Sequence, residues 1–110
     1  MKVYELHNSA GGTFAFEVEN TFLGRRGVVR VVRSIPGAVV TRTPKLLSWF
    51  REEQFCEFIV DGREFVAWEP YGDNSRYWIG PKKEPPEWCE QTAKVMEAFR
   101  NRGLLGFAAG

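Results

Sequence analysis

The chain has 110 residues, of which 44% are hydrophobic and 26% charged, and its 15 basic residues nearly balance its 14 acidic ones. A chain of this size can bury a hydrophobic core without a metal ion or disulfides, but it has no room for a second domain. A net charge of +1 excludes a nucleic-acid clamp or a polybasic membrane binder that works through the charge of the whole protein.

The apolar segments and the cysteines indicate a reduced, cytoplasmic protein. No apolar run approaches the roughly 18 residues that cross a bilayer, and the opening MKVYELHNSAGG lacks the charged and then apolar pattern of a signal peptide. We therefore expect a cytoplasmic protein that does not bind a membrane. Cys56 and Cys89 lie far apart without a CxxC spacing, so we expect two reduced, mostly buried thiols, no disulfide, no metal site and no cofactor.

The first third of the chain predicts a hairpin followed by a helix. Strands are expected at 2–7 and 13–19, joined by turn residues at 8–12, with one face of the second strand formed by Phe14, Phe16 and Val18. Residues 21–33 favour a helix, with Asn20 or Thr21 as its N-cap and Pro36-Gly37 after its end. At helical spacing one face of this segment holds Val28, Val31, Val32 and Ile35, and another holds Arg26, Arg30 and Arg33.

A second hairpin is predicted in the middle of the chain. A strand at 38–42 precedes residues 43–53, which form either a short helix after Thr43-Pro44 or an extended arm. The pair Asp61-Gly62 favours a type I′ turn between strands at 55–60 and 63–68. The turn fixes which residues face each other across the two strands. Three pairs are expected on the core side, Val60/Arg63, Phe58/Phe65 and Cys56/Ala67. Three are expected on the other side, Ile59/Glu64, Glu57/Val66 and Phe55/Trp68.

The last third predicts a short strand at 76–80 and a helix at 87–102, with Gly103 as the C-terminal cap of the helix. The buried face of this helix is expected to hold Trp88, Thr92, Val95, Met96 and Phe99. The apolar tail at 104–110 either docks against the body or frays. We therefore predict one α+β domain over 1–103, a two-layer sandwich in which a mainly antiparallel sheet of about five strands carries two helices on one face.

No catalytic signature is present. The sequence lacks the P-loop, the dinucleotide-binding glycines, the nucleophile elbow and the HExxH motif. His7 is the only histidine, so any histidine-dependent mechanism must use it. We expect a protein without catalytic activity; an enzyme would require His7 and Asp73 to converge in one pocket.

The segment from Glu69 to Pro81 is rich in side chains that recognise other molecules. Aromatic rings, arginine and asparagine combine large contact area with directional hydrogen bonds. A structural explanation also exists, because the central residues of the segment are ordinary turn residues and its aromatics can pack in the core. With the preceding strand this segment supplies the predicted partner-binding residues Trp68, Tyr71, Asp73, Asn74, Arg76 and Trp78.

Charge is unevenly distributed. Residues 20–45 have a local charge of +6 and no acid, whereas residues 46–70 have a local charge of −4. The arginines of the first helix either solvate its outer face, bind a polyanion, or attract the acidic hairpin within the fold or across a dimer.

These patterns lead to one main hypothesis and one alternative. The main hypothesis is a small non-catalytic module that binds a protein partner, or a second copy of itself, through the polar-aromatic loop and the open face of the sheet. The alternative is binding of nucleic acid or another polyanion through Arg26, Arg30 and Arg33.

Overall fold

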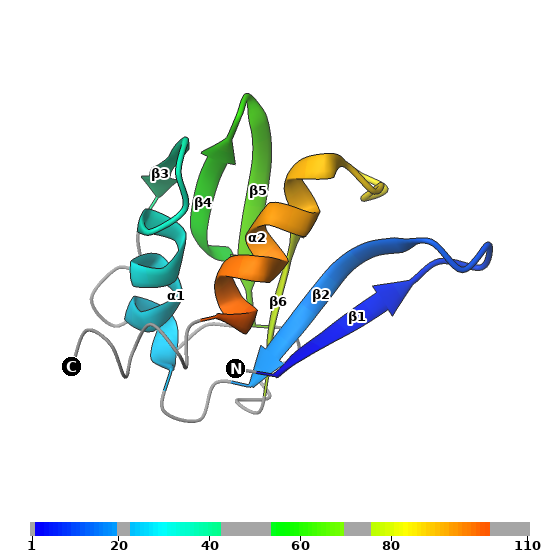
Figure 1. Ribbon diagram of the computed structural model, residues 1–110, viewed down its shortest axis with the longest axis horizontal. Helices are drawn as coiled ribbons and strands as arrows, with labels where there is room; N and C mark the ends of the chain where they lie inside the picture. Colours follow the sequence, from blue (N-terminus) through cyan, green and yellow to red (C-terminus); the bar gives the residue numbers. More distant parts are fainter. Residues whose placement is uncertain (1, 20–22, 43–53, 70–75, 102–110) are drawn as a thin grey trace.

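The computed structural model describes residues 2–19, 23–42, 54–69 and 76–101 (Figure 1). They form six strands, β1 (Val3–His7), β2 (Thr13–Glu19), β3 (Ala38–Arg42), β4 (Gln54–Val60), β5 (Arg63–Trp68) and β6 (Arg76–Pro81), and two helices, α1 (Gly24–Arg33) and α2 (Glu90–Arg100). The predictions for residues 43–53 and for the tail at 104–110 lie outside these residues. The N-cap of α1 is Leu23 and the C-cap of α2 is Asn101, so the predicted caps, Asn20 or Thr21 and Gly103, are wrong. No helix among them is long and apolar enough to cross a membrane.

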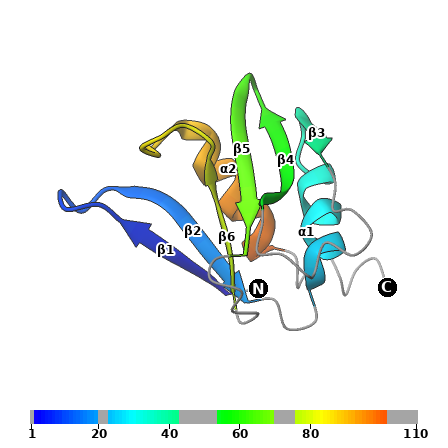
Figure 2. The same ribbon diagram turned by 180° about the vertical axis from the view of Figure 1, so that it is seen from behind.

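The strands form one sheet in the order β1-β2-β6-β5-β4-β3, and every neighbouring pair is antiparallel. Figures 1 and 2 show the molecule from opposite sides and place both helices on the same side of the sheet. The predicted α+β architecture is therefore confirmed, with six strands instead of about five. We call the side that carries the helices the core face and the other side the open face.

The core lies between the sheet and the two helices. The buried face of α1 holds Val28, Val31 and Val32, and Ile35 follows it, as the periodicity predicts. Helix α2 buries Thr92, Val95, Met96 and Phe99. Across the sheet, Phe58 and Phe65 stack at 5.5 Å between ring centroids, and Phe16 packs against Phe99 at 5.7 Å. Each such ring removes enough apolar surface from water to stabilise the fold by about 1.5–3 kcal/mol.

The β4–β5 turn has the geometry that its sequence favours. Asp61 and Gly62 have φ angles of 49° and 84°, the left-handed values that a type I′ turn requires. The predicted register holds for the five pairs Val60/Arg63, Ile59/Glu64, Phe58/Phe65, Glu57/Val66 and Cys56/Ala67.

The predicted pair of Phe55 with Trp68 is wrong. The register shifts between Gln54 and Cys56, so Trp68 pairs with Gln54 and Phe55 is an extra residue in β4. This bulge turns Phe55 to the core face, where it is 2% exposed and its ring lies 4.9 Å from that of Tyr77. A hydrophobic ring gains more in the core than on the open face, which explains the direction of the shift.

Both helices are shorter than predicted, whereas the strand ends differ from the prediction by at most one residue. Helix α1 begins at Gly24 instead of Thr21, and α2 spans Glu90–Arg100 instead of 87–102. Trp88 therefore precedes α2 and is 49% exposed, so its predicted place on the buried helix face is wrong. In β2, Phe16 and Val18 enter the core while Phe14 is half-buried, and Ala15 is buried on the open face.

Candidate functional site

A row of side chains crosses five strands on the open face. Direct cross-strand pairing connects, in order, Tyr4, Glu17, Trp78, Trp68 and Gln54. We call these five residues the aromatic row. Its strands are drawn from β1 to β4 in the rear view of Figure 2.

The two tryptophans at the centre of the row pack edge to face. Their ring centroids are 6.1 Å apart and the rings are inclined by 60°, a favoured arrangement for aromatic pairs. Both side chains are half-buried. The pair thus combines a rigid aromatic contact with a remaining accessible surface.

Gly80 provides space for the indole of Trp78. A Cβ at Gly80 would lie 2.9 Å from Cη2 of Trp78 and 2.7 Å from Cβ of Ala15. Ala15 is fully buried, and Val66, which pairs with Gly80, is 4% exposed. Small residues beside Trp78 therefore allow the indole to lie against the sheet.

Arg76 joins the row to the outer strands. Its guanidinium lies 3.7 Å from the ring centroid of Tyr4, and its Nη1 is 3.3 Å from Oε1 of Glu17. The Tyr4 hydroxyl donates a 2.6 Å hydrogen bond to Glu19, and this bond to a carboxylate is the main reason that the Tyr4 pKa is raised. The side chain of Arg76 is still 41% exposed, so it can make further contacts.

A second charged group lies beyond the tryptophans, around Glu57. Lys82 Nζ is 2.5 Å from Oε1 of Glu57, and Arg42 Nη1 is 3.5 Å from its Oε2. The hydrogen bond from Lys82 is the largest cause of a lowered Glu57 pKa, and the same bond raises the pKa of Lys82. Groups of paired charge therefore flank the tryptophans on two sides.

Three of the six predicted partner-binding residues are brought together by the structure. Trp68 and Trp78 are direct neighbours, and Arg76 lies two residues from Trp78 on the same face of β6. Tyr71, Asp73 and Asn74 lie outside the described residues. Sequence reasoning missed Tyr4, Glu17 and Glu19, because alternation within a strand reveals neither the register of β1 with β2 nor the pairing of β2 with β6.

The predicted polyanion residues form a separate surface on α1. Arg26, Arg30 and Arg33 are all exposed, and within the described segments their side chains make no ion pair or hydrogen bond. We call these three residues the arginine stripe. By contrast, Arg25 turns inward and forms an ion pair with Glu69, and Arg42 forms one with Glu57. For these two arginines the basic segment at 20–45 is thus attracted to the acidic segment at 46–70 within one fold.

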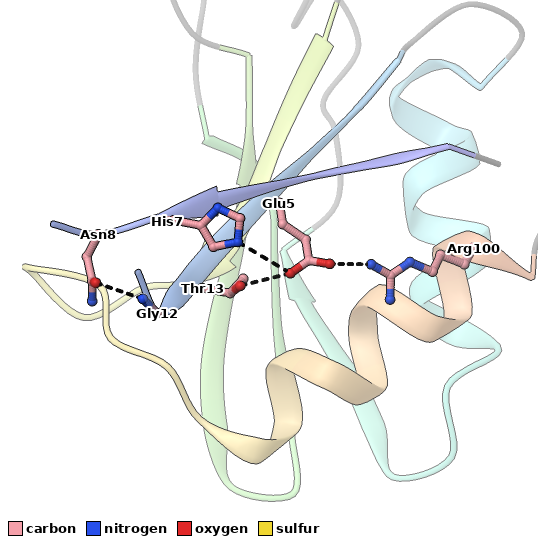
Figure 3. A network of polar contacts seen from close by, with 6 residues as sticks. All are labelled: Glu5, His7, Asn8, Gly12, Thr13 and Arg100. Carbon is pink, nitrogen blue, oxygen red and sulfur yellow. Dashed lines mark hydrogen bonds and ion pairs between the residues drawn. The ribbon is translucent and has the colours of Figure 1, made fainter. Parts of the chain in front are cut away.

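A polar network around Glu5 was not predicted (Figure 3). Its carboxylate accepts hydrogen bonds of 2.8 Å from the Thr13 hydroxyl and 2.7 Å from Arg100, and these bonds lower the Glu5 pKa. His7 Nε2 lies 3.8 Å from the same carboxylate, and the His7 side chain is 53% exposed. The network ties the β1–β2 hairpin to α2, which is a structural role.

The two cysteines differ in accessibility. Cys56 is fully buried, and burial raises the pKa of its thiol to about 12, which disfavours the reactive thiolate. Cys89 is half-buried, and its Sγ is 3.3 Å from the Thr92 hydroxyl. No group of three or more potential metal-binding side chains occurs within the segments that the structure describes.

Two surface cavities lie away from the aromatic row. One, of about 560 Å³, lies between the β4–β5 turn and the segment before α2, and its lining includes Arg63, Lys82, Glu87 and Trp88. The other, of about 320 Å³, lies between the end of α1 and α2, beside Ile35 and Ala98. The larger cavity is lined by both basic and acidic side chains, so its charge selects no class of ligand.

Comparisons with protein-family models, curated proteins and solved structures found no match to this chain.

Proposed function

We propose that the chain is a small, non-catalytic, cytoplasmic interaction module that binds a protein partner through its open sheet face. The observation that carries this proposal is the half-buried pair of Trp68 and Trp78, with Arg76 and Tyr4 beside it. Tryptophan, tyrosine and arginine are the residue types that most often dominate the binding energy of protein interfaces.

The arrangement of apolar and charged groups supports a protein partner on this face. Protein interfaces combine a desolvated apolar centre with a polar rim. Here the tryptophans form the centre, Arg76 with Glu17 borders them on one side, and Glu57 with Lys82 borders them on the other. Because acids and bases are paired on both sides, the face attracts neither a polyanion nor a polycation as a whole.

The edges of the sheet are less suited to binding another chain. Edge strands β1 and β3 each contain a register shift, between Leu6 and His7 and between Val40 and Arg42. Such irregularities interrupt the row of free backbone groups that a further strand would need. The face of the sheet is therefore the better candidate for the contact.

The proposal is tested by affinity capture from extracts of the cells that produce the protein. The double variant Trp68→Ala/Trp78→Ala is compared with wild type, with Arg76→Ala and with Trp88→Ala. Trp88 is a matched control, because it is more exposed than the paired tryptophans and lies outside the row. Circular dichroism and thermal unfolding establish that each variant is folded.

We expect a protein captured by wild type and Trp88→Ala to be lost from the double variant and reduced with Arg76→Ala. Calorimetry with the purified partner then measures the loss, for which hot-spot residues predict at least about tenfold for each tryptophan. Sedimentation of the purified chain covers the case in which the partner is a second copy. Equal capture by all folded variants, together with a monomeric chain, would disprove the proposal.

A further inference from the structure

The arginine stripe stands out when the basic residues are sorted by their partners. Most lysines and arginines in the described part of the chain form ion pairs with acids, namely Arg25, Arg42, Arg76, Lys82, Lys83, Lys94 and Arg100. Lys2 lies over the Tyr4 ring. Four arginines have no acidic partner among the described residues, namely Arg26, Arg30, Arg33 and Arg63. Three of these four lie together on α1.

The stripe is a continuous line of positive charge. Its members are four and three residues apart, so they share one face of α1 and extend over roughly 10 Å along the helix axis. Helix α1 contains no acidic residue, and its opposite face is buried through Val28, Val31 and Val32. The charges therefore repel one another without compensation from their own helix.

Helix stability explains only part of this arrangement. Arg30 and Arg33 occupy the last turn, where a cation interacts favourably with the helix dipole. Arg26 is the third residue of α1, near the positive end of the dipole, where a cation is unfavourable. No acidic side chain of the described residues pairs with Arg26, so helix stability does not account for this arginine there.

We propose that the arginine stripe binds the phosphate backbone of a nucleic acid. Guanidinium groups match phosphate oxygens in geometry as well as in charge. Arginines that contact phosphates alone do not distinguish one base from another. The arginine stripe therefore fits binding that is independent of the nucleotide sequence. This activity is additional to the proposed protein binding and uses a different surface, because α1 packs on the core face.

A membrane surface fits the stripe less well. Recognition of anionic lipids uses clusters of about four to eight basic residues or a helix whose apolar face enters the bilayer. The stripe has three arginines, and the apolar face of α1 is buried against the sheet.

The test measures anisotropy of fluorescein-labelled duplex DNA, single-stranded DNA and RNA at about 50 mM and about 200 mM salt. Three phosphate contacts predict a loss of roughly 40-fold in duplex affinity across this range, since each contact changes the slope of log K against log salt by about 0.9. The variants are Arg26→Gln/Arg30→Gln/Arg33→Gln, each single change, and Arg63→Gln. The last is a matched control, because it removes one unpaired arginine outside the stripe.

We expect the triple variant to lose at least about tenfold in affinity at the lower salt and most of the salt dependence, while Arg63→Gln and the tryptophan variant bind as wild type does. Three results would overturn the proposal: no binding by wild type at about 50 mM salt, equal weakening by Arg63→Gln and a single stripe variant, or binding only to phosphatidylserine vesicles or polyglutamate. Loss of binding in the tryptophan variant alone would assign the nucleic acid to the open face and would also overturn it.

Discussion

Glu69 Oε1 lies 2.6 Å from Arg25 Nη2, and the two side chains are only 6% and 10% exposed. This ion pair joins the residue after β5 to α1, and the Arg25 guanidinium also lies 4.9 Å from the centroid of the Phe55 ring. Removing one member leaves the other charge buried, so we expect Glu69→Ala to lower the free energy of unfolding by about 3–5 kcal/mol. Urea unfolding measures the change.

The neighbouring arginine provides the control for that experiment. Arg26 is exposed, so Arg26→Ala should change the free energy of unfolding by less than about 0.5 kcal/mol. Similar effects of Glu69→Ala and Arg26→Ala would show that the buried pair does not stabilise the fold.

Gly80 is predicted to tolerate no side chain while Trp78 keeps its position. A Cβ there would approach Ala15 and Trp78 within 3 Å, so Gly80→Ala should destabilise the fold by about 1–3 kcal/mol. Ala15→Gly removes one of the two clashing groups, so the double variant should be more stable than the sum of the single changes predicts. Strict additivity of the two changes would contradict this contact.

The effect of a substitution at Asp61 on stability should depend on how well the new residue adopts the left-handed conformation of the β4–β5 turn. With φ at 49°, Asp61→Val places a β-branched residue in the left-handed region and should cost about 1–2 kcal/mol. Asp61→Asn also removes the carboxylate that faces Lys94, but asparagine accepts this conformation. Thermal unfolding should therefore show a large effect for valine and a small one for asparagine; equal effects would indicate that the lost charge is responsible.

Glu57 predicts a loss of stability in acid. Its folded-state pKa lies below the ordinary value of 4.5 because Lys82 and Arg42 bind the carboxylate. The stabilisation is therefore complete above about pH 4.5 to 5 and decreases as the pH falls through the folded-state pKa. Between pH 6 and pH 3 the free energy of unfolding should fall less steeply for Glu57→Gln than for wild type. Parallel curves for the two proteins would show that Glu57 does not contribute to the acid sensitivity.

The two thiols should differ in whether they react before the chain is unfolded. In the folded chain an aromatic disulfide reagent at about pH 8 should modify Cys89, whereas Cys56 is buried with a pKa of about 12 and should react only in denaturant. Cys89→Ser should abolish the reaction of the folded chain. Rapid modification of Cys56 without denaturant would contradict the buried core around it.

Local patterns in the sequence were sufficient for the elements and for much of the core. Alternation in 13–19, the Asp61-Gly62 pair and the valine spacing before Ile35 each act over a few residues, and the corresponding strand, turn and helix face are present. Such patterns succeed because backbone conformation and the burial of one face are decided by neighbours in the chain.

The candidate site depended on contacts that no local pattern contains. Arg76 meets Glu17 across 59 residues, and Trp68 meets Trp78 only because β5 pairs with β6 in the register that places them opposite each other. The sequence predicted three of the residues that gather there by composition alone, but it set Trp68 opposite the wrong partner.

Charge shows the same division. The sequence by itself determined that residues 20–45 carry six basic residues and no acid, and that valines and arginines separate on one helix. Only the tertiary structure decided that Arg25 and Arg42 are neutralised by Glu69 and Glu57, while the arginine stripe is left exposed. Coulomb attraction depends on distance in space, and the folded sheet brings distant acids to some of these arginines and not to others.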